Sequence, residues 1–386
     1  VEERAAAGRE GRRRGGGGGA PGGGGRGAPP PPPPPPPGPP GPPWALALCG
    51  LCLLPHTERA RHTERAQGAP PLRLPAHSPR VEMLVRRFSS PASWPLLVTP
   101  AWLQSRLADP SVAILDCSWY MPAAKRSGRA EFAKESIPGA RFFDIDATSD
   151  ASQDLPHMLP SAGSFERAVA ELGIDAAQHI VCYDGAGVFS APRAWWQFRA
   201  FGHRGVSVLD GGLPAWKLDG LATVAGASPP AVRAGAPAWR ATSEPSGSLR
   251  TLAQMRTIVA DGCASSQVVD ARAAGRFEGS APEPRANCVS GHMPGARSLP
   301  FTKLLRPLAD GSDGTRFASV DELDAAFADA RVDLTRPLVM SCGSGMTACV
   351  LALAAARLGR DDAAVYDGSW AEWGARTDVP IVTGGP

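Results

Sequence analysis

Short apolar runs alternate with longer segments of helical character along the chain from about residue 96 onward. Four of these runs have the length and the Val, Ile and Leu content of buried strands. They span residues 112–116, 180–183, 267–270 and 337–340. Strands that are apolar on both faces and alternate with helices are typical of a mainly parallel sheet. The pattern therefore predicts an α/β fold in which helices flank the sheet.

Two of the helical segments carry clear boundary signals. Ser319-Val-Asp-Glu322 has the pattern of a capping box and predicts the start of an amphipathic helix that reaches Ala330. Residues 346–358 are apolar on nearly every face, and Gly359 follows them. We therefore expect a buried helix over 346–358 that ends at this glycine.

Two blocks of sequence occur twice. Ile-Pro-Gly-Ala-Arg at 137–141 returns as Met-Pro-Gly-Ala-Arg at 293–297, and the Asp-Gly block at 209–216 returns at 366–373. The two offsets, 156 and 157 residues, agree to one residue. Because repetition at a fixed offset indicates a duplicated unit, the chain is predicted to contain two copies of one domain.

The repeat and the changes in composition divide the chain into four parts. Residues 1–95 hold runs of Gly and Pro and are expected to form a disordered extension, because such a segment buries too little apolar surface to offset the entropy of ordering. The two domains are expected at 96–225 and 249–386. Residues 226–248, rich in Ala, Pro, Gly and Ser, are expected to link them.

The extension carries one targeting signal and one pair of cysteines. The first methionine is Met83, so the residues before it are open to interpretation as an over-extended gene model. Met83-Leu-Val-Arg-Arg-Phe-Ser-Ser is basic and contains serine, which predicts a mitochondrial location, with a cytoplasmic location as the alternative. Cys49-Gly-Leu-Cys52 has the spacing of a redox motif, but no βαβ pattern follows it, so we interpret the spacing as accidental.

Charge and cysteine content add limits on the partners and on the compartment of the protein. The chain has 386 residues and a net charge of +3, which gives no argument for binding nucleic acid. The apolar stretch 44–54 is too short to span a bilayer, so no membrane partner is expected. Eight cysteines at irregular spacings show no disulfide framework and favour a reducing compartment.

The most informative segment is Leu338-Val-Met-Ser-Cys342-Gly-Ser-Gly-Met-Thr347. It joins the end of a predicted strand to the start of a predicted helix through a turn with two glycines. Successive backbone N–H groups in such a turn can form an anion-binding nest at a helix N-terminus. Cys342 lies there, where these N–H groups and the helix dipole stabilise a thiolate, so we interpret it as a reactive nucleophile. Gly343 and Gly345 permit the tight curve of the backbone.

This loop closely resembles the active-site loop of 3-mercaptopyruvate sulfurtransferases, which belong to the tandem-domain rhodanese-like sulfurtransferases. The repeated Asp-Gly-Ser-Trp-Ala-Glu-Trp block is also similar to that family, and the resemblance covers residues 96–386. It implies two tandem rhodanese-like domains after the extension. It also implies transfer of sulfur from 3-mercaptopyruvate through a Cys342 persulfide to a thiol acceptor or cyanide, with release of pyruvate.

The residues after the cysteine bear on the choice of donor. Thiosulfate sulfurtransferases of the same fold typically carry basic residues there, which suit a doubly charged donor. This chain has Gly343 and Ser344 instead, which favours the mercapto acid. In the first copy the aligned segment places Asp184 where the second copy has Cys342. A carboxylate cannot form a persulfide, so we expect chemistry only in the second domain.

The resemblance implies further site residues. Arg276 and Arg285 match the two substrate-binding arginine segments of the family, and an arginine fork suits a carboxylate. Asp146 and His157 match segments that supply a triad with the loop serine, here Ser344, which would move a proton to the departing enolate. The loop residues expected to contact the substrate are Gly343, Gly345, Met346 and Thr347.

The resemblance implies no metal and no organic cofactor. The expected partners are a small mercapto acid as donor and a thioredoxin-like protein or small thiol as acceptor. Three alternatives stay open: a thiosulfate sulfurtransferase, a non-catalytic rhodanese-like binding module, and a cysteine phosphatase. The phosphatase usually needs an arginine six positions after the cysteine, and this chain has Ala348 there.

Overall fold

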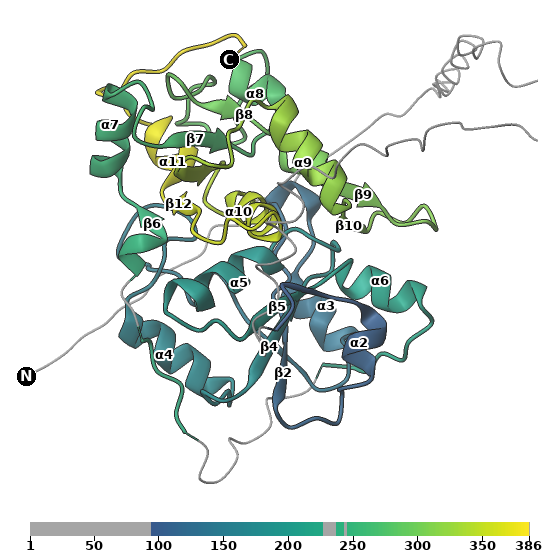
Figure 1. Ribbon diagram of the computed structural model, residues 1–386. Helices are drawn as coiled ribbons and strands as arrows, with labels where there is room; N and C mark the ends of the chain where they lie inside the picture. The colour runs from purple at the N-terminus through teal and green to yellow at the C-terminus, as the bar shows by residue number, and fades with distance from the viewer. Residues whose placement is uncertain (1–93, 227–236, 243–244, 386) are drawn as a thin grey trace, which may run out of the picture. The chain divides into compact units, whose positions relative to one another are not determined.

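Figure 1 shows a computed structural model of the chain, which describes residues 94–226, 237–242 and 245–385. All of these residues belong to one compact unit. The expectations for the presequence at Met83 and for Cys49-Gly-Leu-Cys52 lie outside the described residues, as do those for nearly all of the extension and for part of the linker.

Two five-stranded sheets, each entirely parallel, form the centres of the two halves of the described chain. The strand orders are β1-β5-β4-β2-β3 and β6-β12-β11-β7-β8, which are the same order in two successive segments of chain. The predicted sequence repeat is therefore also a repeat of topology. The first sheet contains β1 (Leu97–Val98), β2 (Val112–Asp116), β3 (Ala140–Phe142), β4 (His179–Tyr183) and β5 (Val206–Leu209). The second contains β6 (Leu249–Arg250), β7 (Gln267–Asp270), β8 (Arg297–Ser298), β11 (Leu338–Ser341) and β12 (Ala364–Tyr366).

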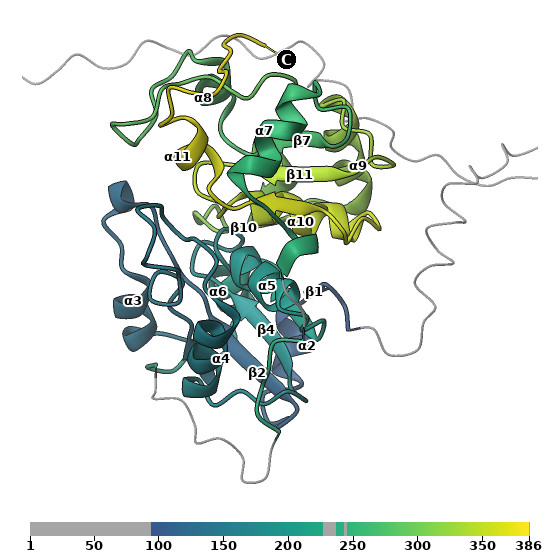
Figure 2. The same ribbon diagram turned by 90° about the vertical axis from the view of Figure 1, so that its left-hand side faces the viewer.

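Helices flank both sheets, as the alternating pattern predicts (Figures 1 and 2). In the first half they are α2 (Pro100–Gln104), η1 (Pro122–Ala124), α3 (Gly128–Lys134), α4 (Ala162–Glu171), α5 (Ala191–Ala200) and α6 (Gly212–Leu218). In the second half they are η2 (Pro245–Gly247), α7 (Leu252–Ala260), α8 (Ala274–Glu278), η3 (Phe301–Leu304), α9 (Val320–Asp329), α10 (Ala348–Arg357) and α11 (Ser369–Trp373). An antiparallel hairpin, β9 (Leu305–Pro307) and β10 (Thr315–Phe317), completes the second half.

The two predicted helices form, and each ends one residue before its predicted end, α9 at Asp329 and α10 at Arg357. Ser319 caps α9 through the expected capping box, in which its side chain and that of Glu322 each accept a backbone N–H group. Helix α10 begins at Ala348, two residues later than expected, because Met346 and Thr347 belong to the preceding loop. Nine of its ten residues are buried, in agreement with its apolar sequence.

The two halves share a continuous apolar core. Helix α5 from the first half and α10 from the second lie side by side between the two sheets (Figure 2), and residues of both belong to one buried cluster. Because α10 begins directly after the Cys342 loop, this packing places that loop beside the first half. No helix within the described residues has both the length and the apolar character needed to cross a bilayer.

Candidate active site

Cys342 is the first residue after the buried strand β11, and its loop leads into α10. Gly345 in this loop has φ +75, a left-handed conformation that glycine adopts without strain. A Cβ at this position would lie 2.9 Å from the carbonyl oxygen of Asp367 and 3.0 Å from Nη1 of Arg193. The loop therefore needs glycine for both its backbone conformation and its packing.

Backbone N–H groups of the loop have two different environments. Those of Cys342 and Gly345 donate to Oγ of Ser369, at 3.2 and 3.0 Å, and this hydroxyl donates to the carbonyl of Tyr366. Four others have no acceptor among the residues that the structure describes. They belong to Gly343, Ser344, Met346 and Thr347. These four amides are available to bind an anion near the sulfur.

The corresponding loop of the first half already holds an anion, which the chain itself supplies. Asp184 follows β4 as Cys342 follows β11, and it is buried. Its carboxylate accepts four backbone N–H groups at 2.8–3.0 Å, three of them at the start of α5. The donors are Ala186, Phe189, Ser190 and Ala191. A loop of this shape therefore binds a carboxylate, and in the second half a thiol takes the carboxylate's place in the sequence.

Ser344, His157 and Asp146 come together from the two halves of the molecule. Nδ1 of His157 lies 3.0 Å from Oγ of Ser344, and Nε2 lies 3.3 Å from Oδ1 of Asp146. The hydrogen bond from His157 lowers the pKa of Asp146. Trp119 donates its indole N–H to the same carboxylate and packs edge-on against the imidazole. With Nε2–H donating to Asp146, Nδ1 accepts the Ser344 hydroxyl proton, so the chain can move a proton through the serine.

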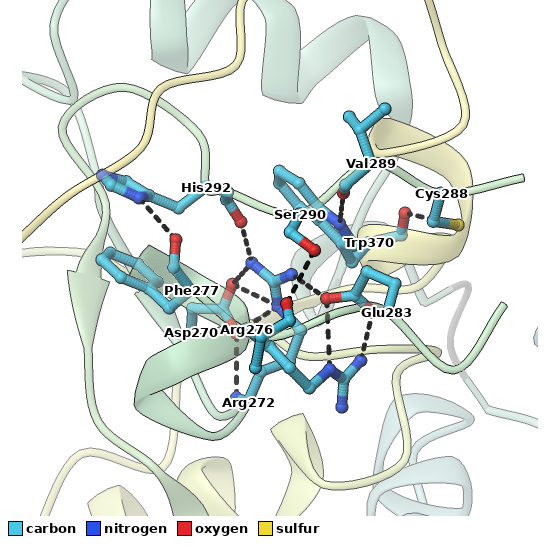
Figure 3. A network of polar contacts seen from close by, with 12 residues as sticks. Asp270, Arg272, Arg276, Phe277, Glu283, Cys288, Val289, Ser290, His292 and Trp370 are labelled. Carbon is cyan, nitrogen blue, oxygen red and sulfur yellow. Dashed lines mark hydrogen bonds and ion pairs between the residues drawn. The ribbon is translucent and has the colours of Figure 1, made fainter. Parts of the chain in front are cut away.

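The two predicted substrate arginines lie over the loop. A Cβ built on Gly343 would be 3.2 Å from Nη2 of Arg276 and 3.7 Å from Nη1 of Arg285. Arg276 forms an ion pair with Glu283, as Figure 3 shows. The side chain of Arg285 forms no hydrogen bond or ion pair with any described residue. Two guanidinium groups beside the loop can bind a carboxylate.

Arg193, which the sequence analysis missed, connects both halves of this site. It is fully buried on α5, forms an ion pair with Asp367 at 2.7 Å, and donates to the carbonyls of His157 and Gly345. Burial lowers the pKa of Arg193, but the charges and hydrogen bonds of Asp367 and Cys349 together outweigh this effect and raise the pKa. Oδ2 of Asp367 accepts the N–H of Leu159 at 2.6 Å. The sequence signal was a charged residue within the apolar run of α5.

Cys342 is almost completely buried, whereas a nucleophile must be accessible to the donor that it attacks. The residue is 2% exposed, and Ser344 and His157 beside it are also buried. The cause is its position at the boundary of the two halves, where the first half covers the loop. All six cysteines within the described residues are free thiols, and no group of three or more His, Cys, Asp or Glu side chains in that part of the chain is placed to hold a metal ion.

The fold and the site together define a protein of the rhodanese type. The sequence model of the rhodanese-like domain matches residues 99–219 and 251–376, so the chain belongs to the rhodanese-like family and contains two copies of its domain. Its sequence is 44% identical to 3-mercaptopyruvate sulfurtransferase of Rattus norvegicus over 296 residues, which cover 74% of this chain and 94% of the relative.

Two further comparisons point in the same direction. The chain is 39% identical over 301 residues to mitochondrial thiosulfate/3-mercaptopyruvate sulfurtransferase 1 of Arabidopsis thaliana, covering 74% of this chain and 77% of that protein. The crystal structure of SseA from Escherichia coli, a 3-mercaptopyruvate sulfotransferase, superposes with a TM-score of 0.62 and 37% identity, covering 72% of this chain and 99% of that one. The predicted family and the predicted tandem fold are thus confirmed.

Proposed function

We propose that this protein is a sulfurtransferase that takes sulfur from 3-mercaptopyruvate, carries it as a persulfide on Cys342 and passes it to a thiol. The observation that supports this best is the pair of equivalent loops. In one loop, backbone amides hold the carboxylate of Asp184, and in the other, amides that have no acceptor among the described residues belong to the four positions around a thiol. An anionic sulfur species at Cys342 would be stabilised in the same way.

In the first half-reaction Arg276 and Arg285 bind the donor carboxylate beside the loop. The Cys342 thiolate attacks the donor sulfur, so a new S–S bond forms and the donor's C–S bond breaks. The bonding electrons stay on the donor carbon as the enolate of pyruvate. A proton restores the methyl group, and the donor's thiol proton balances it, so the products are pyruvate and the persulfide anion.

The proposed role of Ser344, His157 and Asp146 is to carry that proton. Ser344 belongs to the loop, so its hydroxyl can first pass the donor's thiol proton to Nδ1 of His157. The imidazolium can then return this proton through Ser344 to the departing enolate. Asp146 fixes the imidazole through Nε2. The remaining loop residues proposed to contact the substrate are Gly343, Gly345, Met346 and Thr347.

In the second half-reaction an acceptor thiolate attacks the outer sulfur and frees the Cys342 thiolate. A dithiol, either a thioredoxin-like protein or a small molecule, can then release sulfide by forming its own disulfide, so the acceptor supplies the two electrons. Cyanide would take the same sulfur atom as thiocyanate. We infer no metal and no organic cofactor in either step.

We also propose a mitochondrial location and the domain limits 96–225 and 249–386. The basic segment at Met83 and the mitochondrial relative in Arabidopsis support the location, and the two family matches support the limits. Fractionation of cells that express the full chain tests the location, and recovery in the cytosol would contradict it. Limited proteolysis tests the limits, since cleavage between residues 226 and 248 is expected.

The test of the function is a donor assay on the wild type and on Cys342→Ser. Wild type should release pyruvate from 3-mercaptopyruvate and gain one sulfur atom by mass spectrometry, whereas Cys342→Ser should do neither. Cys263→Ser is the control, because Cys263 is a buried cysteine whose Sγ donates to the Pro294 carbonyl, and it should react as wild type does. Pyruvate release by Cys342→Ser would contradict the proposal, as would a wild-type Cys342 that never gains sulfur.

Thiosulfate is the second candidate donor, because the Arabidopsis relative is named for both compounds. The same assay with thiosulfate, in which sulfite is measured, discriminates between them. We expect the higher kcat/KM with 3-mercaptopyruvate, since no basic residue follows Cys342 directly.

A further inference from the structure

Arg276 is held in place by a carboxylate that the sequence analysis did not single out. Nε of Arg276 donates to Oε1 of Glu283 at 3.1 Å, and Nη2 donates to Oε2 at 2.5 Å. The side chain of Glu283 is 2% exposed, whereas that of Arg276 is 22% exposed. Two hydrogen bonds therefore fix one edge of the guanidinium (Figure 3). Nη1 has no hydrogen-bond partner within the described part of the chain and can donate to a ligand.

Glu283 is itself held in place by a second arginine. Nη1 of Arg272 donates to its Oε1 at 2.7 Å, and Arg272 is fully buried. Arg272 also donates to both carboxylate oxygens of Asp270 and to the carbonyl of Gly291, and its Cζ lies 4.0 Å from the ring centroid of Trp370. Figure 3 shows these groups as one connected network. Since Arg272 is fixed in this way, the Glu283 carboxylate cannot turn away without leaving a buried charge unpaired.

The network also sets the charge beside the Cys342 loop. Arg272 and Arg276 carry two positive charges, and Asp270 and Glu283 carry two negative ones, so the four side chains cancel. Arg285 then contributes the only unbalanced charge among these five residues. A local charge of one positive unit matches one carboxylate better than it matches a doubly charged anion.

We propose that Glu283 determines the donor charge that this site accepts. It positions Arg276 for a carboxylate and cancels enough positive charge that a singly charged 2-oxo acid is preferred to a dianion such as thiosulfate. This inference rests on the proposed function. It does not depend on the residues that directly follow Cys342, because Glu283 acts from the opposite side of the arginines.

The substitution Glu283→Gln tests the role of the charge. The amide keeps the size of the side chain but removes the negative charge, so the potential at the donor rises, and a dianion gains twice as much as a monoanion. The ratio of kcat/KM for thiosulfate to that for 3-mercaptopyruvate should rise about tenfold, a value reduced by the partial exposure of Arg276 to water. KM for 3-mercaptopyruvate should rise as well, because Arg276 loses one of its two contacts.

Two further variants separate charge from geometry. Glu283→Asp keeps the charge but shortens the side chain, so kcat/KM should fall for both donors while their ratio stays as in wild type. Asp378→Asn is the matched control, because Asp378 also bridges two arginines, Arg256 and Arg376, at the surface. It should leave both kcat/KM values unchanged.

The inference would be overturned if Glu283→Gln left the ratio of kcat/KM for thiosulfate to that for 3-mercaptopyruvate unchanged. It would also be overturned if Glu283→Asp raised this ratio as much as Glu283→Gln does. If thermal unfolding shows that Glu283→Gln does not fold, inhibition of wild type decides: pyruvate should compete more strongly than sulfate, and the reverse order would overturn the inference. Failure of the proposed function is seen separately, as a wild type that releases no pyruvate from 3-mercaptopyruvate.

Discussion

At the scale of single residues, one hydroxyl fixes both ends of the Cys342 loop. Oγ of Ser369 accepts the N–H groups of Cys342 and Gly345 and donates to the carbonyl of Tyr366 at the end of β12. Ser369 has φ +50, a conformation uncommon outside glycine, which indicates that its neighbours impose it. The position of the sulfur therefore depends on a residue that need not touch the donor.

Removal of this hydroxyl in Ser369→Ala should leave two buried N–H groups without an acceptor. We expect a loss of about 2 kcal/mol in the free energy of unfolding and a fall of roughly tenfold in kcat/KM. Urea unfolding and the pyruvate assay measure the two effects. Ser369→Gly provides the comparison, because it also removes the hydroxyl but relieves the left-handed backbone. Wild-type kcat/KM in either variant would show that the hydroxyl does not position the loop.

Sequence reasoning could find some of these residues but not others. Cys342 is predicted from its position between a strand end, two glycines and a helix start, whereas Ser344, His157 and Asp146 are predicted from their resemblance to family motifs. The structure brings the last three into contact, and the roles of all four remain predictions. Ser369, Glu283 and Arg193 were missed. Ser369 and Arg193 act through groups that are distant in the sequence, and Glu283 acts through charged side chains 7 and 11 residues away. Only the fold shows those contacts.

At the scale of elements, the same strand–loop–helix unit occurs in both halves, but the loop carries a different functional group in each. The loop from β4 to α5 contains Gly187 at φ +100, and the loop from β11 to α10 contains Gly345 at φ +75. A Cβ would collide with backbone atoms at both glycines. The duplicated unit thus keeps its backbone requirement, although one loop holds a carboxylate and the other a thiol.

Gly345→Ala should therefore have a larger effect than the strain of a left-handed alanine backbone alone would cause. Its Cβ would lie 2.9 Å from the carbonyl oxygen of Asp367, so the loop must move and kcat should fall at least tenfold. Gly139→Ala is the matched control, because Gly139 has φ +78 but no atom within 4 Å of the added Cβ. It should lose only about 1 kcal/mol of stability and keep wild-type kcat. Equal effects of the two variants on kcat would contradict the steric argument.

The limits of elements were predicted less well than their existence. The runs at 112–116 and 267–270 match β2 and β7 in full. β4 begins one residue before its predicted start, and β11 is shifted by one residue at both ends. The predicted helix over 346–358 began too early, because Met346 continues the apolar pattern although its backbone is part of the loop. Hydrophobic periodicity reports which residues are buried, and it does not report where helical hydrogen bonding begins.

At the scale of the whole molecule, the repeat predicted two domains but not how they pack. Helices α5 and α10 are buried on almost every face because each covers its own sheet and the other helix. The sequence shows both helices as apolar, and that property alone does not reveal that they contact each other. Their packing brings His157 to Ser344 and Arg193 to Asp367, so the site exists only in the assembled pair.

The ion pair of Arg193 and Asp367 should then be necessary for activity as well as for stability. Arg193→Met leaves Asp367 buried without its charge partner, which typically costs about 3–5 kcal/mol in the free energy of unfolding. It also removes the donor to the carbonyls of His157 and Gly345, so kcat should fall together with stability. Denaturant unfolding and the pyruvate assay measure the two quantities.

A double variant and a second ion pair separate these two roles. Arg193→Met with Asp367→Asn removes both charges and keeps an acceptor for the N–H of Leu159, so stability should partly recover while kcat stays low. Arg199→Met breaks another ion pair between α5 and the second half, in which Asp361 is 58% exposed, and it should cost no more than about 1 kcal/mol and leave kcat unchanged. A double variant with wild-type kcat would mean that Arg193 only stabilises the fold. A low kcat in a stable double variant would instead show that the domain boundary itself positions His157 against the Cys342 loop.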